Sequence, residues 1–118
     1  MTFQRKQLGA SGEDLAEEYL IKKGYKILQR NLHFKVGEID ILAQDDKTIV
    51  IVEVKTKRYT YQGSPEEQVD YFKQRKLRLL GRAISQQFLD QPIRIDVIAI
   101  DETDFEPKIN HIVNAVTC

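Results

Sequence analysis

Two β-branched runs that are joined by four polar residues most constrain the fold of this 118-residue chain. The first run covers residues 38–43, the second covers residues 48–55, and residues 44–47 connect them. Such runs with a short polar connection are typical of a β-hairpin. The second run is apolar at successive positions until Glu53, so we expect a central strand that is covered on both faces. The sequence therefore predicts a sheet built around a buried hairpin.

Helix signals flank this hairpin on both sides. Residues 11–14 form a variant of the capping box, and apolar positions then continue with helical spacing, which predicts a helix over residues 11–23. Residues 64–67 combine a capping serine, a proline and a glutamate, so a long helix should begin there and end before Pro92. Further strands are predicted over residues 25–32, 93–100 and 108–113. The order αβββαββ predicts an α/β fold in which helices flank a mixed sheet.

Composition is that of one ordinary domain, which we expect to span residues 1–118. The chain has 18 basic and 18 acidic residues, and its single cysteine, Cys118, excludes an internal disulfide. No apolar run is long enough to span a bilayer, and no apolar segment follows the first basic residues. These features predict a cytoplasmic protein without membrane association.

The positive charge is concentrated in the middle of the chain. Residues 55–82 contain eight basic and three acidic residues, whereas residues 83–118 contain two basic and six acidic ones. Helical spacing places Lys73 within the apolar face of the long helix, where a cation must snorkel or contact an anion. Basic residues in this region are candidates for salt-sensitive phosphate binding, and a solvated helix face is the alternative. The candidates for nucleic-acid binding are Lys57, Arg58, Lys73, Arg75, Arg78 and Arg82.

The hairpin also carries acidic residues at a strand's spacing of two. Glu38 and Asp40 share one face of the first strand, and Glu53 and Lys55 share one face of the second. A two-residue turn at positions 46–47 would place Asp40 opposite Glu53, with Cβ atoms about 5 Å apart. A register slip of one residue would separate them.

Two carboxylates at that distance raise the pKa of one of them unless a cation joins them. Mg²⁺ is such a cation, because it accepts one or two carboxylates together with water and phosphate oxygens. Lys55 could then orient or deprotonate a water molecule, or stabilise negative charge on a phosphate. The alternative is a salt-bridge ladder on a solvent face, which stabilises the fold only weakly.

These motifs resemble the PD-(D/E)xK nuclease superfamily, through Asp40, through Glu53-Val54-Lys55 after the hairpin, and through Glu13 in the first helix. Nearly the whole chain is similar to one branch, the bacterial YraN-like family, which is related to archaeal Holliday junction resolvases. The matching positions are Gly12-Glu13, Ala16, Tyr19-Leu20, Lys23-Gly24-Tyr25, Asn31, Gly37-Glu38-Ile39-Asp40, Val52-Glu53-Val54-Lys55-Thr56, Gly63, Lys73, Leu77 and Arg94-Ile95-Asp96-Val97.

The resemblance implies a restriction-endonuclease-like core and a metal-dependent endonuclease that hydrolyses phosphodiester bonds in DNA, with branched or irregular DNA as the expected substrate. Its implied catalytic residues are Glu13, Asp40, Glu53 and Lys55. The first three would bind Mg²⁺ or Mn²⁺, and Lys73 would contact a phosphate. Resolvase relatives act as dimers, so a homodimer is a further expectation. A non-catalytic nucleic-acid-binding or adaptor protein on the same fold remains the alternative, because a fold does not guarantee chemistry.

Overall fold

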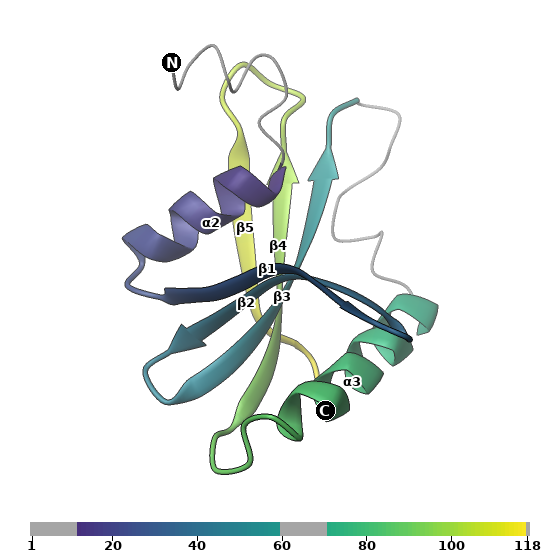
Figure 1. Cartoon of the computed structure of the whole chain (residues 1–118). Coiled ribbons are helices and arrows are strands. Elements are labelled where there is room, and N and C mark those ends of the chain that lie inside the picture. Colours follow the sequence, from purple (N-terminus) through teal and green to yellow (C-terminus); the bar gives the residue numbers. More distant parts are fainter. Residues whose placement is uncertain (1–11, 60–70, 118) are drawn as a thin grey trace.

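Five strands form one mixed sheet, in the spatial order β1-β2-β3-β4-β5, with two helices packed on it (Figure 1). The computed structural model describes residues 12–59 and 71–117. The predicted order αβββαββ is confirmed. The elements are α2 (Gly12–Lys22), β1 (Lys26–Phe34), β2 (Gly37–Asp45), β3 (Thr48–Lys57), α3 (Tyr71–Ser85), β4 (Ile93–Asp101) and β5 (Lys108–Val116).

Some predicted boundaries differ from those of the structure. The last strand continues to Val116 rather than ending at residue 113. Helix α3 ends at Ser85, before Pro92 as predicted. The predicted start of this helix at residue 64 lies outside the described residues, and so does the capping serine Ser11.

Strand β3 is the central strand, as its apolar sequence predicts. It pairs antiparallel with β2 and parallel with β4, and the parallel pairing needs the long connection that contains α3. Residues Ile49, Val50, Ile51 and Val52 are fully buried. The prediction that this strand is covered on both faces is therefore confirmed.

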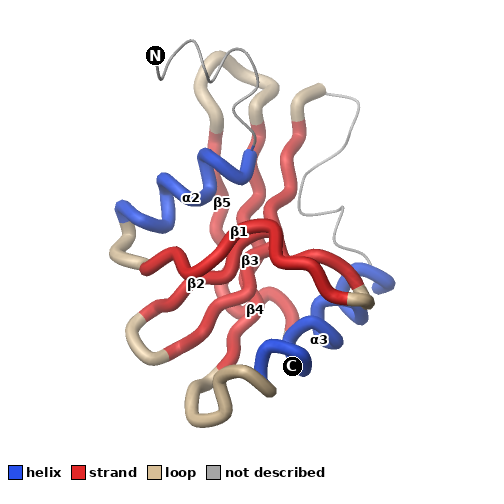
Figure 2. The backbone as a smooth tube through the Cα atoms, in the orientation of Figure 1, coloured by secondary structure: helices blue, strands red, loops and turns tan. Residues whose placement is uncertain are grey.

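Alternate residues of β3 supply two hydrophobic cores, one under each helix (Figure 2). Val50 and Val52 pack on the face that carries α2, because side chains two apart share a face. Ile49 and Ile51 pack on the face that carries α3. The α2 core includes Ala16, Leu20, Ile41, Ala43, Ile98 and Ile100, and the α3 core includes Ile39, Leu42, Leu77, Leu80, Ile84 and Ile95.

The hairpin has the register that a two-residue turn predicts. Asp45 pairs with Thr48, and the paired residues continue to Ile41 and Val52. Asp46 adopts a positive φ of 56° in the turn, which an aspartate tolerates better than most residues. Asp40 precedes Ile41, so it lies just beyond the last pair, at the end of the hairpin away from the turn.

A glycine at the start of α2 allows this helix to approach the end of β3. A Cβ atom at Gly12 would collide with Oγ1 of Thr56, so a larger residue would push the helix away. Because Glu13 follows directly, this close contact positions its side chain near the functional strands.

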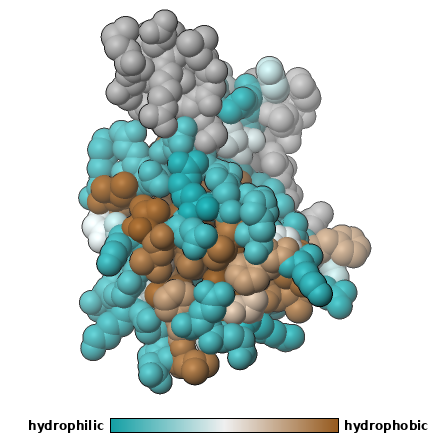
Figure 3. Space-filling view, in the orientation of Figure 1, coloured by the Kyte–Doolittle hydropathy of each residue, from teal (hydrophilic) through white to brown (hydrophobic). Residues whose placement is uncertain are grey.

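The described surface mixes hydrophilic residues with apolar patches (Figure 3). The most exposed large apolar side chains include Phe72 on α3 and Phe105 between β4 and β5. Neither α2 nor α3 is long and apolar enough, within its described residues, to cross a membrane.

Candidate active site

A cleft of about 370 Å³ is bordered by α2, by α3 and by the ends of β2 and β3. All four residues that the resemblance implies as catalytic line it: Glu13, Asp40, Glu53 and Lys55. The remaining lining residues are Glu38, Val54, Lys73, Lys76, Leu77 and Leu80. The fold therefore brings together side chains from four elements. Three of these side chains, those of Glu13, Asp40 and Glu53, are acidic candidates for a metal site.

Glu53 is the most buried charged group of the cleft, with only 5% of its surface exposed. Its Oε2 atom lies 3.3 Å from Nζ of Lys55 and 3.0 Å from Nζ of Lys73. A buried carboxylate is tolerated only when it is paired in this way. The contact also explains why a lysine lies on the apolar face of α3: the ammonium of Lys73 contacts an anion.

Asp40 lies beside Glu53 and accepts a hydrogen bond of 2.8 Å from the backbone N–H of Val54. Burial and the negative charge of Glu53 raise the pKa of Asp40 to about 7, although the Val54 hydrogen bond acts in the opposite direction. The charge of Glu13 adds to the increase. Asp40 therefore ionises less readily than an exposed aspartate.

Two of the lysines that line the cleft, Lys55 and Lys73, differ in their affinity for a proton. Burial and the neighbouring Lys73 lower the pKa of Lys55, although Glu53 opposes this. Burial also acts to lower the pKa of Lys73, but its hydrogen bonds with Lys55 and Glu53 outweigh burial and raise that pKa. Lys55 is thus the lysine that more readily releases a proton, and Lys73 is the permanent cation.

Side chains from β1 hold the acidic rim of the cleft. With its amide oriented so that the nitrogen faces the carboxylates, Asn31 donates to Oε1 of Glu13 at 3.0 Å and to Oε1 of Glu38 at 2.8 Å. Arg30 contacts Glu13 at 3.4 Å and Asp14 at 2.8 Å. Asn31 has a positive φ of 53° within β1, a conformation that favours asparagine over most residues.

The donor set fits a hard divalent cation through two carboxylates rather than three. Within residues 12–59 and 71–117, no three His, Cys, Asp or Glu side chains are close enough to form a ligand group. Asp40 and Glu53 nevertheless line one cleft, where burial and the charge of Glu53 raise the pKa of Asp40. Because Mg²⁺ binds through one or two carboxylates plus waters and phosphate oxygens, these residues fit it.

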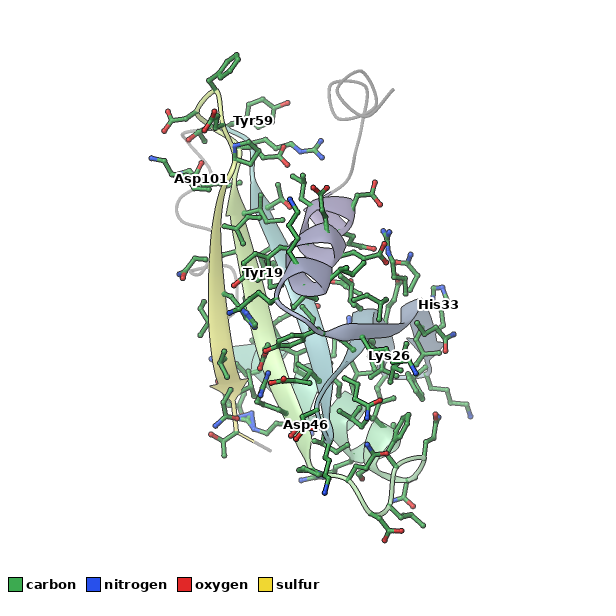
Figure 4. All side chains as sticks on the ribbon, turned by 90° about the vertical axis from the view of Figure 1, so that its left-hand side faces the viewer. Tyr19, Lys26, His33, Asp46, Tyr59 and Asp101 are labelled. Carbon is green, nitrogen blue, oxygen red and sulfur yellow. The ribbon has the colours of Figure 1, made fainter. Side chains whose placement is uncertain are left out.

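The predicted nucleic-acid-binding residues occupy three places. Lys73 lines the cleft. Lys57 and Arg58 lie at the end of β3, near Asp101 and Tyr59 and far from the Asp46 turn (Figure 4), and Nε of Arg58 lies 3.5 Å from Oε2 of Glu102. Arg75, Arg78 and Arg82 line a separate groove on α3.

The sequence reasoning did not assign a site role to Lys76, which lines the cleft, or to Asn31, which contacts two of its acidic residues. Lys76 follows Lys73 by three residues, so helical spacing places both on neighbouring parts of one face, which is a signal that could have found it. Asn31 belongs to the matching positions of the resemblance, but its contacts with Glu13 and Glu38 depend on an irregular backbone that no periodicity predicts.

Comparison with known proteins gives one family. The profile described as "Uncharacterised protein family UPF0102" matches residues 12–100. A UPF0102 protein of Syntrophomonas wolfei is 47% identical over 115 residues, which cover 93% of this chain and 97% of the relative. One of Thermodesulfovibrio yellowstonii is 48% identical over 112 residues, covering 94% and 96%. One of Geobacter metallireducens is 46% identical over 117 residues, covering 98% and 96%.

A solved structure entitled "Structure of EndoMS-dsDNA2 complex" is similar with a TM-score of 0.48 and 18% identity. The similarity covers 74% of this chain and 35% of that chain, and it is too remote to support an inference about activity. The profile match and the near full-length relatives agree with the YraN-like resemblance of the sequence. The chain belongs to the UPF0102 family.

Proposed function

We propose that this chain is a metal-dependent endonuclease that hydrolyses phosphodiester bonds in DNA within the cleft described above. One observation carries the proposal: two adjacent carboxylates, Asp40 and Glu53, share a cleft with two lysines of opposite pKa shift. Carboxylates that face a phosphate are unfavourable unless a cation lies between them, so a purely phosphate-binding cleft has no use for them.

Asp40 and Glu53 would hold Mg²⁺ or Mn²⁺, and Glu13 would support them from α2. When bound, such an ion supplies positive charge and lowers the pKa of a coordinated water molecule. Glu53 keeps Lys55 in place through the 3.3 Å ion pair. The Val54 N–H fixes the Asp40 carboxylate through Oδ2, and Asp40 also hydrogen-bonds Glu53.

Burial and the neighbouring Lys73 lower the pKa of Lys55, which is the direction that a proton acceptor needs. Lys55 would take a proton from the water that attacks phosphorus, while the bond from phosphorus to the leaving oxygen breaks. Lys73, whose pKa is raised, stays positively charged and would bind a phosphate oxygen beside the reacting one. Lys76 lines the same cleft and would add a second fixed cation for the backbone.

The testing experiment is cleavage of labelled DNA in Mg²⁺ or Mn²⁺. The panel contains single strands, duplexes, flaps and four-way junctions, together with RNA of the same sequence. Asp40→Ala, Glu53→Ala and Lys55→Ala should each lower the cleavage rate at least about 100-fold. The matched control is Glu18→Gln, because Glu18 lies on the same helix as Glu13 but is exposed and forms an ion pair with Lys22.

A wild-type chain that cleaves, with loss in the three cleft variants and none in Glu18→Gln, supports the proposal. Any of the three alanine variants cutting as fast as wild type overturns the assigned role of that residue.

Binding without cleavage in the wild type favours the non-catalytic alternative. One observation is compatible with that alternative: Lys55 and Lys73 already neutralise Glu53 without a metal ion. In that case Glu53→Ala should weaken nucleic-acid binding little, since the two lysines that it releases remain available to phosphate.

A further inference from the structure

The outward side of α3 carries a groove of about 340 Å³ that is separate from the acidic cleft. It is lined by Tyr71, Arg75, Arg78, Leu79 and Arg82. Tyr71, Arg75, Arg78 and Arg82 are separated by four, three and four residues, so they form one stripe along the helix. We call these four residues the outer stripe.

The outer stripe concentrates charge that the described protein does not balance. None of the described residues forms an ion pair with Arg75, Arg78 or Arg82 within 4 Å. Like charges at spacings of three and four residues destabilise a helix modestly. By contrast, Arg30, Arg58 and Arg94 each contact a carboxylate. The arginines of the stripe therefore have no carboxylate partner among the described residues, an arrangement that suits an anionic ligand.

The outer stripe and the acidic cleft lie on opposite sides of the same helix. Lys73, Leu77 and Leu80 face the sheet and line the cleft. At 100° per residue, the centre of the outer stripe is roughly 180° away from these residues. Since a helix with its side chains is about 10 Å thick, a straight strand in the cleft cannot also lie along the stripe.

The chemistry of the outer stripe suits a phosphodiester backbone. Guanidinium groups match phosphate oxygens in a bidentate geometry. Arg75 and Arg82 are separated by about 10 Å along the helix axis, a length that covers about three nucleotides of one DNA strand. Tyr71, 66% exposed at the start of the stripe, offers a ring on which a base can stack.

We propose that the outer stripe is a second nucleic-acid-binding site, which holds a backbone segment other than the segment in the acidic cleft. The proposal rests on the proposed function for the identity of the cleft's ligand, and the stripe's own ligand follows from its arginines. One chain then contacts two separated segments of nucleic acid, as a folded or branched substrate would present them.

The first test measures the salt dependence of binding to a labelled 20-base-pair duplex. The variant is Arg75→Gln/Arg78→Gln/Arg82→Gln, and the matched control is Lys22→Gln/Lys26→Gln/Lys47→Gln, which removes the same charge from exposed lysines elsewhere. Each lost phosphate contact lowers the slope of log K against log salt by about 0.9, so the arginine variant should lose about 2 to 3 in slope. The lysine control should change by less than 1. Equal losses in both variants would overturn the proposal, because net charge alone would explain them.

The second test counts binding sites with a four-nucleotide single strand, which spans about 14 Å and is too short to reach around α3. Titration at protein concentrations above the dissociation constant should give two strands per wild-type chain and one per arginine-variant chain. One strand per chain in both proteins would overturn the proposal. Thermal unfolding of each variant verifies that it remains folded.

The two proposals fail in different ways. A chain that binds with an arginine-dependent slope but cuts no substrate overturns the nuclease and leaves the outer stripe in place. A chain that cuts DNA while the arginine variant keeps the wild-type slope overturns the outer stripe alone.

Discussion

Glu53 on β3 and Asp96 on β4 are both buried carboxylates, and they belong to neighbouring parallel strands. Glu53 follows the residues of β3 that pack under α3, whereas Asp96 lies in register with Val52 on the side of α2. The sheet therefore buries one acid on each face. Asp40 lies beside Glu53, and its surroundings differ from those of Asp96.

Asp96 receives all the donors that it needs from the chain. Arg94 donates through Nε to Oδ1 at 2.9 Å and through its terminal nitrogen to Oδ2 at 3.0 Å. Nε2 of His111 lies 2.7 Å from Oδ2, and the backbone N–H of Asn114 donates to Oδ1 at 2.9 Å. Burial acts to raise the pKa of Asp96, but the bonds from His111 and Arg94 outweigh it and lower that pKa.

The cleft shows the opposite balance. Asp40 has the Val54 N–H as its hydrogen-bond donor, next to the charge of Glu53, and its pKa is raised to about 7. Lys55 and Lys73 both contact Glu53. A carboxylate whose donors are complete stabilises the fold, while one that lacks a counter-charge is available to bind a cation from solution.

The largest expected effect is on stability at Asp96. Asp96→Ala should lower the free energy of unfolding by about 3–5 kcal/mol, because it removes the buried anion that Arg94 and the buried side chain of His111 both contact. Urea unfolding at pH 7 measures this, with Asp104→Ala as an exposed control. A loss of free energy of unfolding below 1 kcal/mol would show that the Asp96 carboxylate does not stabilise the fold as we describe.

The second expected effect is a gain in stability, on substitution of Asp40. Between its ordinary pKa of 3.8 and about 7, the folded state holds a proton on Asp40 that the unfolded state has lost. The free energy of unfolding therefore falls as pH rises through this window. Asp40→Asn cannot lose that proton, so without divalent cations it should be more stable than wild type by about 2 kcal/mol at pH 8.

Below pH 4 the Asp40 carboxyl of the wild type is protonated and therefore uncharged, like the asparagine of the variant. The difference in free energy of unfolding between the two proteins should then disappear. Urea unfolding at pH 4, 6 and 8 in a chelator gives the comparison. An asparagine variant that is less stable than wild type at pH 8 would mean that Asp40 is already neutralised by the chain.

A third, smaller effect concerns the cation itself. Mg²⁺ or Mn²⁺ at ten times its dissociation constant should stabilise the wild type by about 1.4 kcal/mol. Asp40→Asn and Glu53→Gln should lose this gain, whereas Asp104→Asn should keep it. Thermal unfolding with and without chelator measures the difference, and an equal gain in all four proteins would place the cation elsewhere.

The fold was largely predictable because several local signals agree. The turn length and the apolar pattern of the hairpin both require one register, and that register is observed from Asp45–Thr48 to Ile41–Val52. The strand period then places Glu53 and Lys55 on one face. These are short-range relations, and the candidate site follows from them.

The Asp96 network could not be predicted in the same way. His111 and Asn114 lie 15 and 18 residues after Asp96, and they meet it through β4–β5 pairing that is irregular between Ile95 and Val97. No sequence period sets such a register. The rim contacts of Asn31 depend likewise on a positive φ inside a strand.

The smallest expected change in stability comes from substitution of Asn31 at the rim of the cleft, which can be compared with substitution of Asp96. Asn31 is exposed and bridges Glu13 and Glu38, so its hydrogen bonds compete with water. Asn31→Gly keeps the backbone conformation and removes the amide, and it should lower the free energy of unfolding by about 1 kcal/mol. Asn31→Ala keeps a Cβ at a φ of 53° without the asparagine side chain that tolerates this conformation, so it should cost about 1 kcal/mol more than Asn31→Gly.

Urea unfolding of both Asn31 variants separates the amide from the backbone. If glycine and alanine are equal, the positive φ stores no strain; if glycine equals wild type, the amide holds neither carboxylate. The cleavage rate then tests whether the rim matters for the cleft, because Glu13 without its Asn31 contact should be less well positioned beside Asp40. We expect a rate loss in Asn31→Gly that is larger than its loss of stability explains, whereas Asp96→Ala should lose activity only as far as it unfolds.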